Sequence, residues 1–135
     1  MESGCARDAP AFADAQHAFI ERTHYRPAVH AVNGQTGLDL DVRADAVRDA
    51  CWSVAVQHGA AARILCRAVG LARAGCDPRQ RRFDRALIEA IYAERSAYVR
   101  KVAGTLPQPA CRTLLAVAAR RYPAELAQAL AMLPA

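Results

Sequence analysis

The side chains best placed to bind a polar ligand lie at the end of the stretch from Asp45 to Gly59. This stretch predicts a helix, because Asp45 suits the N-cap and Gly59 suits the left-handed position that often follows a helix. Gln57 and His58 then emerge at its C-terminal end, where the helix dipole favours an imidazolium ion and a glycine lets a ligand approach the backbone. We expect Gln57 and His58 to bind substrate. The alternative is that His58 only hydrogen-bonds the last carbonyls of its helix.

Two aromatic rings and two carboxylates extend this set. Tyr25 and Trp52 carry amphipathic rings suited to stacking on a sugar, although such rings belong more often to a core. Glu89 and Glu94 are weak candidates for catalytic acids on one predicted helix. A glycosidase needs two carboxyl groups about 5 to 10 Å apart across a cleft. The sequence does not place either glutamate opposite another acid, so it assigns no catalytic residue.

Common enzyme and metal motifs are missing from the chain. It contains no glycine-rich phosphate loop, no His-Glu-x-x-His helix and no Gly-x-Ser-x-Gly turn. The histidines, His17, His24, His30 and His58, do not have the spacing of metal ligands. Cys51 lies about 10 Å from His58 along the same helix, too far to act with it as nucleophile and base. We expect neither a metal nor a cofactor.

The elements that must position these residues are helical. Apolar residues recur at helical spacing, alanine is abundant, and no pair of strands is visible. We therefore predict a single all-α domain over residues 1–135: an orthogonal bundle of about six or seven helices around a buried central helix, Asp45–His58, with Trp52 in its middle. Residues 1–7 are expected to form a loose N-terminus. The predicted helices span residues 8–23, 27–32, 45–58, 60–74, 83–102, 111–121 and 123–133.

One charged residue falls on an inward stripe. The predicted helix 83–102 repeats Leu87, Ile88, Ile91, Arg95, Tyr98 and Val102 at helical spacing. A buried arginine needs a partner, and we expect Glu94 or an acid of the central helix to supply it. On the preceding helix, Leu71 is expected to face the core.

Charge and cysteine content limit the possible partners and compartments. The net charge of +5 and the pI near 9.3 permit an acidic partner, but the basic residues are dispersed and not interleaved with stacking aromatics, so nucleic acid is not expected. The five cysteines match no disulfide scaffold, and a reduced state is favoured over a Cys66–Cys76 bridge. No signal sequence or membrane span is visible, so we expect the chain to be cytoplasmic as synthesised unless it is carried out of the cell.

Three segments of the chain carry a family resemblance. They are Ala15-Gln-His-Ala-Phe-Ile-Glu-Arg-Thr-His-Tyr25, Trp52-Ser-Val-Ala-Val-Gln-His-Gly59 and Leu87-Ile-Glu-Ala-Ile-Tyr-Ala-Glu-Arg95, in this order, with Arg121-Tyr122 extending the match. Together they resemble the helical C-terminal region of phage-associated and VgrG-related bacterial proteins of lysozyme-like or chitosanase-like character. The resemblance implies a lysozyme-like helical lobe that acts on peptidoglycan or a related amino-sugar polymer. It also implies a role in phage lysis or type VI secretion, with delivery to the periplasm or a target cell.

The chain departs from that family in one respect. Such relatives are expected to carry their acid-bearing, Tyr-Gln-containing portion upstream, whereas only Met1 to Ala11 precede the match here and the Glu2-Ser3-Gly4 motif is short. We therefore expect a domain derived from a peptidoglycan hydrolase that forms one wall of a glycan groove, with Tyr25, Trp52, Gln57 and His58 as binding residues. Its own hydrolase activity is left open. The alternative is a non-enzymatic adaptor that packs against a partner protein or an upstream domain.

Overall fold

The described part of the chain is built from six α-helices and contains no strand. The computed structural model describes residues 2–134, with side chains from residue 10 onward. The helices are α1 (Glu2–Ile20), α2 (Arg26–Thr36), α3 (Asp45–Gln57), α4 (Ala61–Gly75), α5 (Phe83–Ala103) and α6 (Ala110–Ala131). A π-helical turn, Glu21–Tyr25, joins α1 directly to α2, and a short 3₁₀ turn, Leu40–Val42, precedes α3. The all-α prediction is confirmed.

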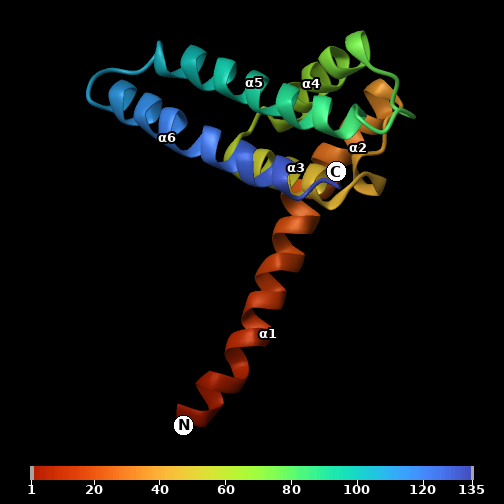
Figure 1. The fold of residues 1–135 in the computed structure, drawn as a ribbon. Coiled ribbons are helices and arrows are strands. Elements are labelled where there is room, and N and C mark those ends of the chain that lie inside the picture. Colours follow the sequence, from red (N-terminus) through yellow and green to blue (C-terminus); the bar gives the residue numbers. More distant parts are fainter. Residues whose placement is uncertain (1, 135) are drawn as a thin grey trace.

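Five of the helices pack into one body, and α1 extends away from it (Figure 1). Helix α5 packs against α4 and α6, while α2 packs against α4 and α3 contacts α4, α5 and α6. The long α5 and α6 run side by side and are joined by a short connection. Their packing brings the C-terminal end of α3 against the middle of α5.

Helix α5, rather than α3, has the most deeply buried apolar face. Its apolar residues with 0% exposure are Phe83, Leu87, Ile88 and Ile91. Helix α3 buries one face, but Trp52 is only half-buried and Val56 is exposed, so the prediction of a helix buried on all sides is wrong. Neighbouring helices therefore cover only part of the α3 surface.

The ends of α3 also differ from the prediction. Ala44 occupies the N-cap position, and Asp45 lies in the first turn, where its charge still suits the helix dipole. His58 follows the helix in an extended conformation with φ −125°, so Gly59 does not need a left-handed backbone. Among the described residues the left-handed glycine is Gly37, with φ 75°, at the end of α2.

Two prolines that were expected to start helices lie inside them. Pro10 is within α1, and Pro123 is within α6, so the last two predicted helices form one continuous helix. An internal proline costs a helix about 3 kcal/mol, and here Tyr122 and Ala129 are buried on either side of Pro123 and offset that cost. Helix α1 begins at Glu2 and so includes residues assigned to a loose terminus, while Met1 and the side chains of the Glu2-Ser3-Gly4 motif lie outside the description.

Two leucines test the assignment of the core. Leu87 is 0% exposed, whereas Leu71, predicted to face inward, is 52% exposed. Leu87→Ala should lower the free energy of unfolding by about 2 to 5 kcal/mol, because it empties a packed site. Leu71→Ala should change it by less than about 0.5 kcal/mol. Urea denaturation followed by circular dichroism measures both, and equal losses would contradict this core.

Candidate binding site around Arg95

The buried guanidinium of Arg95 connects three helices at one point. Arg95 lies on α5 and is 0% exposed. Its Nε donates to His58 Nε2 at 3.1 Å, one terminal nitrogen donates to Ser53 Oγ at 3.0 Å, and the other donates to Gln57 Oε1. Ser53 and Gln57 lie in the C-terminal half of α3, and His58 is the residue that follows it. The inward position predicted for Arg95 is therefore confirmed, and its direct partners are neutral.

Aromatic rings and a more distant carboxylate compensate the charge of Arg95. The guanidinium carbon lies 4.3 Å from the centroid of the Tyr122 ring and 5.7 Å from that of Tyr92, so both rings make cation–π contacts. The Ser53 hydroxyl, which accepts from Arg95, donates in turn to Glu125 Oε1 at 3.3 Å. This relay lets the Glu125 carboxylate balance the buried cation through one hydroxyl group.

The expected partner of Arg95 was wrong. Glu94 forms an ion pair with Arg67, with 3.3 Å between the nitrogen and oxygen atoms. Adjacent residues on a helix point about 100° apart, so Glu94 cannot lie on the inward face of Arg95. Glu125 Oε2 is buried without a hydrogen bond, although the Arg121 guanidinium lies 3.9 Å away, within ion-pair distance. We treat that contact as electrostatic only, because it is too long for a hydrogen bond.

His58 is a neutral acceptor in this site. Because Arg95 Nε–H donates to Nε2, the proton of the neutral ring must be on Nδ1. Burial, and then the positive charge of Arg95, lower the pKa of His58 to about 4. The imidazolium favoured by the helix dipole is therefore not the form present near neutral pH. The Tyr122 hydroxyl is 3.4 Å from Nε2, and the ring of Tyr98 meets the imidazole edge-on at 5.5 Å.

A groove opens beside this cluster. Its volume is about 400 Å³, and its polar lining comes from the ends of α3 and the facing surfaces of α5 and α6. The polar and aromatic lining residues are Gln57, His58, Tyr98, Arg121 and Tyr122. They supply hydrogen bonds, ring surfaces and one exposed cation, but no nucleophile with an adjacent base. Its lining residues include no carboxyl group that could protonate a leaving group.

The two predicted stacking rings lie together at a different place. Trp52 stacks on the His17 ring of α1, with centroids 4.5 Å apart, and meets the Tyr25 ring at 5.4 Å. Tyr25 is buried, and its hydroxyl donates to Asp41 Oδ1 at 2.8 Å. Burial and this bond raise the pKa of Tyr25 to about 12, and the same bond lowers the pKa of Asp41. Neither Tyr25 nor Trp52 lines the groove beside Arg95.

The two glutamates also lie outside that groove. Glu89 pairs with Arg85 at 3.4 Å and lines a separate cavity of about 640 Å³ between α5 and α6. Glu94 is occupied by Arg67, as described above. Among the residues with described side chains, no group of three histidines, cysteines or acids is placed to hold a metal ion. The four described cysteines are free, so Cys66 and Cys76 are not bridged.

Ser53, Tyr122 and Glu125 complete the Arg95 cluster, and sequence analysis did not assign them to it. Ser53 lies inside the most specific resembling segment, and Tyr122 ends that resemblance, so both carried a signal. Glu125 follows Tyr122 by three residues and therefore shares its helix face. Residue spacing within each helix does not show that α3 and α6 both pack against α5, and this packing brings the cluster together.

The comparison with protein families identifies the chain. The model of the type VI secretion system spike protein VgrG3-like C-terminal family matches residues 3–116. The chain belongs to this family. The VgrG-related part of the resemblance is therefore confirmed, and the match includes Arg95 and its partners Ser53, Gln57 and His58. No curated protein and no solved structure matches the chain. None of the helices in the described range is long and apolar enough to cross a membrane.

The fork of hydrogen bonds from Arg95 predicts that lysine cannot replace it. An ammonium group keeps the charge but cannot reach Ser53, Gln57 and His58 together. We expect Arg95→Lys to lower the free energy of unfolding by about 2 to 4 kcal/mol, because buried acceptors lose their donors. Arg100→Lys, at an exposed position on the same helix, is the matched control and should change stability by less than about 0.5 kcal/mol. Chemical denaturation of the two variants is the measurement. Similar values would show that Arg95 is not held by this fork.

The lowered pKa of His58 predicts acid sensitivity. Between about pH 6.5 and pH 4 the unfolded chain binds a proton at His58, whereas the folded chain does not. The contribution of His58 to the free energy of unfolding is therefore complete above this window and falls as the pH is lowered through it. The loss attributable to His58 should be about 1 to 2 kcal/mol. Urea titrations at about pH 7 and pH 4.5 should show a smaller loss in His58→Gln than in the wild type. An equal loss would exclude His58 as its source.

Proposed function

We propose that this chain is a non-catalytic, glycan-binding domain of a type VI secretion spike protein, and that the groove beside Arg95 holds peptidoglycan or a related amino-sugar polymer. The groove supports this proposal because it combines ring surfaces with hydrogen-bonding groups in a concave site. Family membership supplies the association with a secretion spike. Cell-wall material is a polymer that a delivered spike domain would meet.

The hydrogen bonds to Arg95 determine which groups remain for a ligand. Gln57 Oε1 and His58 Nε2 both accept from Arg95, so the groups left are the Gln57 amide nitrogen and the His58 Nδ1–H. Both are donors, and Arg121 adds a third set of donors at the rim. A suitable ligand must therefore present acceptors. N-acetyl carbonyls, sugar hydroxyls and the carboxylates of peptidoglycan have this chemistry.

The arrangement of acids supports binding without cleavage. Glu89 and Glu94 come from one helix, and each is paired with an arginine. Hydrolysis needs a protonated acid on one side of the glycosidic bond and a carboxylate on the other. Nothing in the groove supplies that pair. Derivation from a lysozyme-like hydrolase remains part of the proposal.

A second candidate function is that of a non-enzymatic adaptor. Helix α1 extends away from the body, and its Phe12 and Phe19 side chains are 65% and 53% exposed (Figure 1). Apolar rings on a helix outside the core favour contact with another protein. This candidate predicts association in solution and no affinity for glycan.

Adjacent arginines provide a sharp test of the glycan proposal. Arg121 lines the groove, whereas Arg120 is exposed on the same helix and does not. The wild-type chain should co-sediment with purified peptidoglycan sacculi and release no muropeptides. Arg121→Ala should weaken binding about tenfold through loss of a charge-assisted hydrogen bond, and Arg120→Ala should bind like the wild type.

Two other outcomes would contradict the proposal. Release of muropeptides that is abolished by Glu89→Gln or Glu94→Gln would show that the chain is itself a hydrolase. A chain that does not sediment with sacculi, and that self-associates or forms a defined complex in size-exclusion chromatography with light scattering, would support the adaptor instead. A monomer that sediments with sacculi would count against the adaptor.

A further inference from the structure

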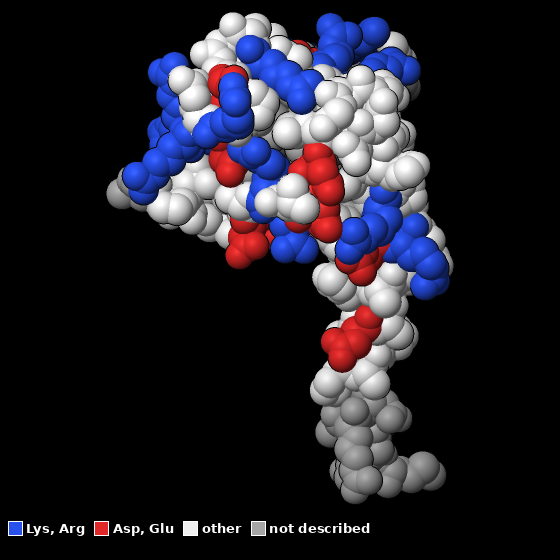
Figure 2. All heavy atoms as spheres, turned by 90° about the vertical axis from the view of Figure 1, so that its right-hand side faces the viewer, with Lys and Arg blue, Asp and Glu red and all other residues white. Residues whose placement is uncertain are grey.

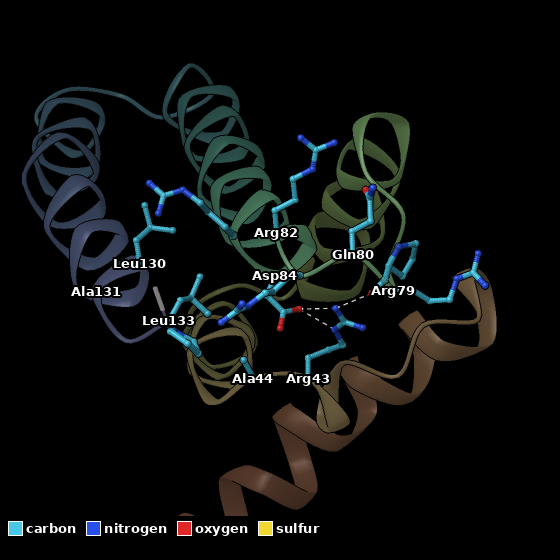
Figure 3. Close-up of a pocket in the computed structure, with 13 residues that line it drawn as sticks. Arg43, Ala44, Arg79, Gln80, Arg82, Asp84, Leu130, Ala131 and Leu133 are labelled. Atoms are coloured by element: carbon cyan, nitrogen blue, oxygen red, sulfur yellow. Dashed lines mark hydrogen bonds and ion pairs between the residues drawn. The ribbon is translucent and has the colours of Figure 1, made fainter.

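A larger groove, separate from the Arg95 site, has both arginines and apolar residues in its lining (Figure 3). In that view the side chains of Arg79 and Arg82 extend outward, away from Leu130 and Leu133. It lies between the loop that leads into α5, the first turn of α5 and the end of α6, and its volume is about 1060 Å³. The cationic lining residues are Arg43, Arg79, Arg81, Arg82 and Arg85, with Asp84 as the one acid. None of its lining residues belongs to the groove beside Arg95.

Arg43 builds this groove rather than serving as its binding group. It forms an ion pair with Asp84 at 2.8 Å, donates to the Pro78 carbonyl at 3.1 Å and lies 5.0 Å from the centroid of the buried Phe83 ring. These contacts fix the loop to the start of α5. The other lining arginines lie on this loop and on the start of α5, which Arg43 connects.

Arg79, Arg82 and Arg85 are exposed and can meet an anionic partner. Arg79 pairs with Asp77 and Arg85 with Glu89, but both arginines are exposed, and exposed ion pairs contribute only about 0 to 1 kcal/mol. Such pairs can exchange for a better carboxylate. Arg82 is exposed and has no ion-pair partner among the described side chains. A ligand with two or more carboxylates can therefore engage this side of the groove in bidentate contacts.

The opposite side of the groove selects for apolar groups. Leu130, Ala131, Leu133 and Pro134, from the end of α6 and the residues after it, form this side. Leu130 and Leu133 are only partly buried against the core, so a ligand can cover them further. No aromatic residue lines the groove, which removes the stacking surface that single-stranded nucleic acid needs.

Charge is mixed on one face of the molecule. On the face shown in Figure 2, basic and acidic side chains lie interspersed rather than in one basic stripe. A general attraction for polyanions does not account for the five arginines around a single concavity with an apolar wall. The combination matches a ligand that carries carboxylates on one edge and aliphatic side chains on the other.

We propose that this groove docks an acidic segment of a partner protein, with its carboxylates against Arg79, Arg82 and Arg85 and its aliphatic side chains against Leu130 and Leu133. The occupant is assigned from charge complementarity and from a volume that suits a short peptide segment. The proposal does not depend on glycan binding, because the two grooves share no lining residue.

A peptide of known composition tests this docking site. The probe is a fluorescein-labelled peptide of alternating glutamate and leucine, and fluorescence anisotropy with the full chain measures its affinity. Arg82→Glu should weaken binding at least tenfold, and Arg82→Gln should weaken it less. Arg63→Glu, at an exposed position on α4 away from the groove, should have no effect. A matched peptide with lysine in place of glutamate should not bind, and one with serine in place of leucine should bind more weakly.

Several results would overturn the proposal. They are no binding of the glutamate–leucine peptide at low salt, equal weakening by Arg63→Glu and Arg82→Glu, and no dependence on leucine. Stronger competition by oligothymidine or by anionic phospholipid vesicles than by unlabelled peptide would assign the groove to a different partner. Circular dichroism of each variant confirms that the helices are retained, so loss of binding can be attributed to the groove.

Discussion

The packing of the helices depends on how the permanent positive charge of Arg95 is buried. An arginine cannot lose its proton in a protein, so Arg95 can be fully buried only if its surroundings replace the water it leaves. Three acceptors from α3 and the residue after it, two aromatic rings and a carboxylate reached through Ser53 do this together. Because these groups come from α3, α5 and α6, the charge fixes how the three helices meet. A neutral residue at this position would not demand any of these groups.

The same requirement shapes the proposed binding surface. Arg95 takes up the acceptor atoms of Gln57 and His58, and it thereby leaves donors at the groove beside them. Burial and positive charge also keep His58 neutral. The polarity of the groove is thus a consequence of a structural interaction inside the core. The arginine-lined groove is independent of it, since its shape is set by Arg43, Asp84 and the loop before α5.

Sequence analysis anticipated the helical class and the inward position of Arg95, because both follow from residue spacing within single segments. It did not anticipate the partners of Arg95, because acceptors on α3 and rings on α6 meet only after the helices cross. Gly59 follows the end of α3 as expected, although without a left-handed backbone, whereas Pro123 carried a signal for a helix start and lies inside α6. Trp52 was expected inside a helix enclosed on all sides, but the structure places it half-buried beneath the His17 ring of α1. Residue spacing within single helices could not show which of the predicted site residues lie in one groove.

The junction between α1 and the body has a mechanical consequence. Helix α1 is 19 residues long, which corresponds to about 28 Å of rigid rod at the usual rise per residue. It meets the body through the π-helical turn Glu21–Tyr25 and the stack of His17 on Trp52. A rod of this length magnifies small changes at its base, so that a tilt of about 10° moves its far end by about 5 Å. The π-helical turn and the face-to-face contact of two rings therefore set the direction of α1 together.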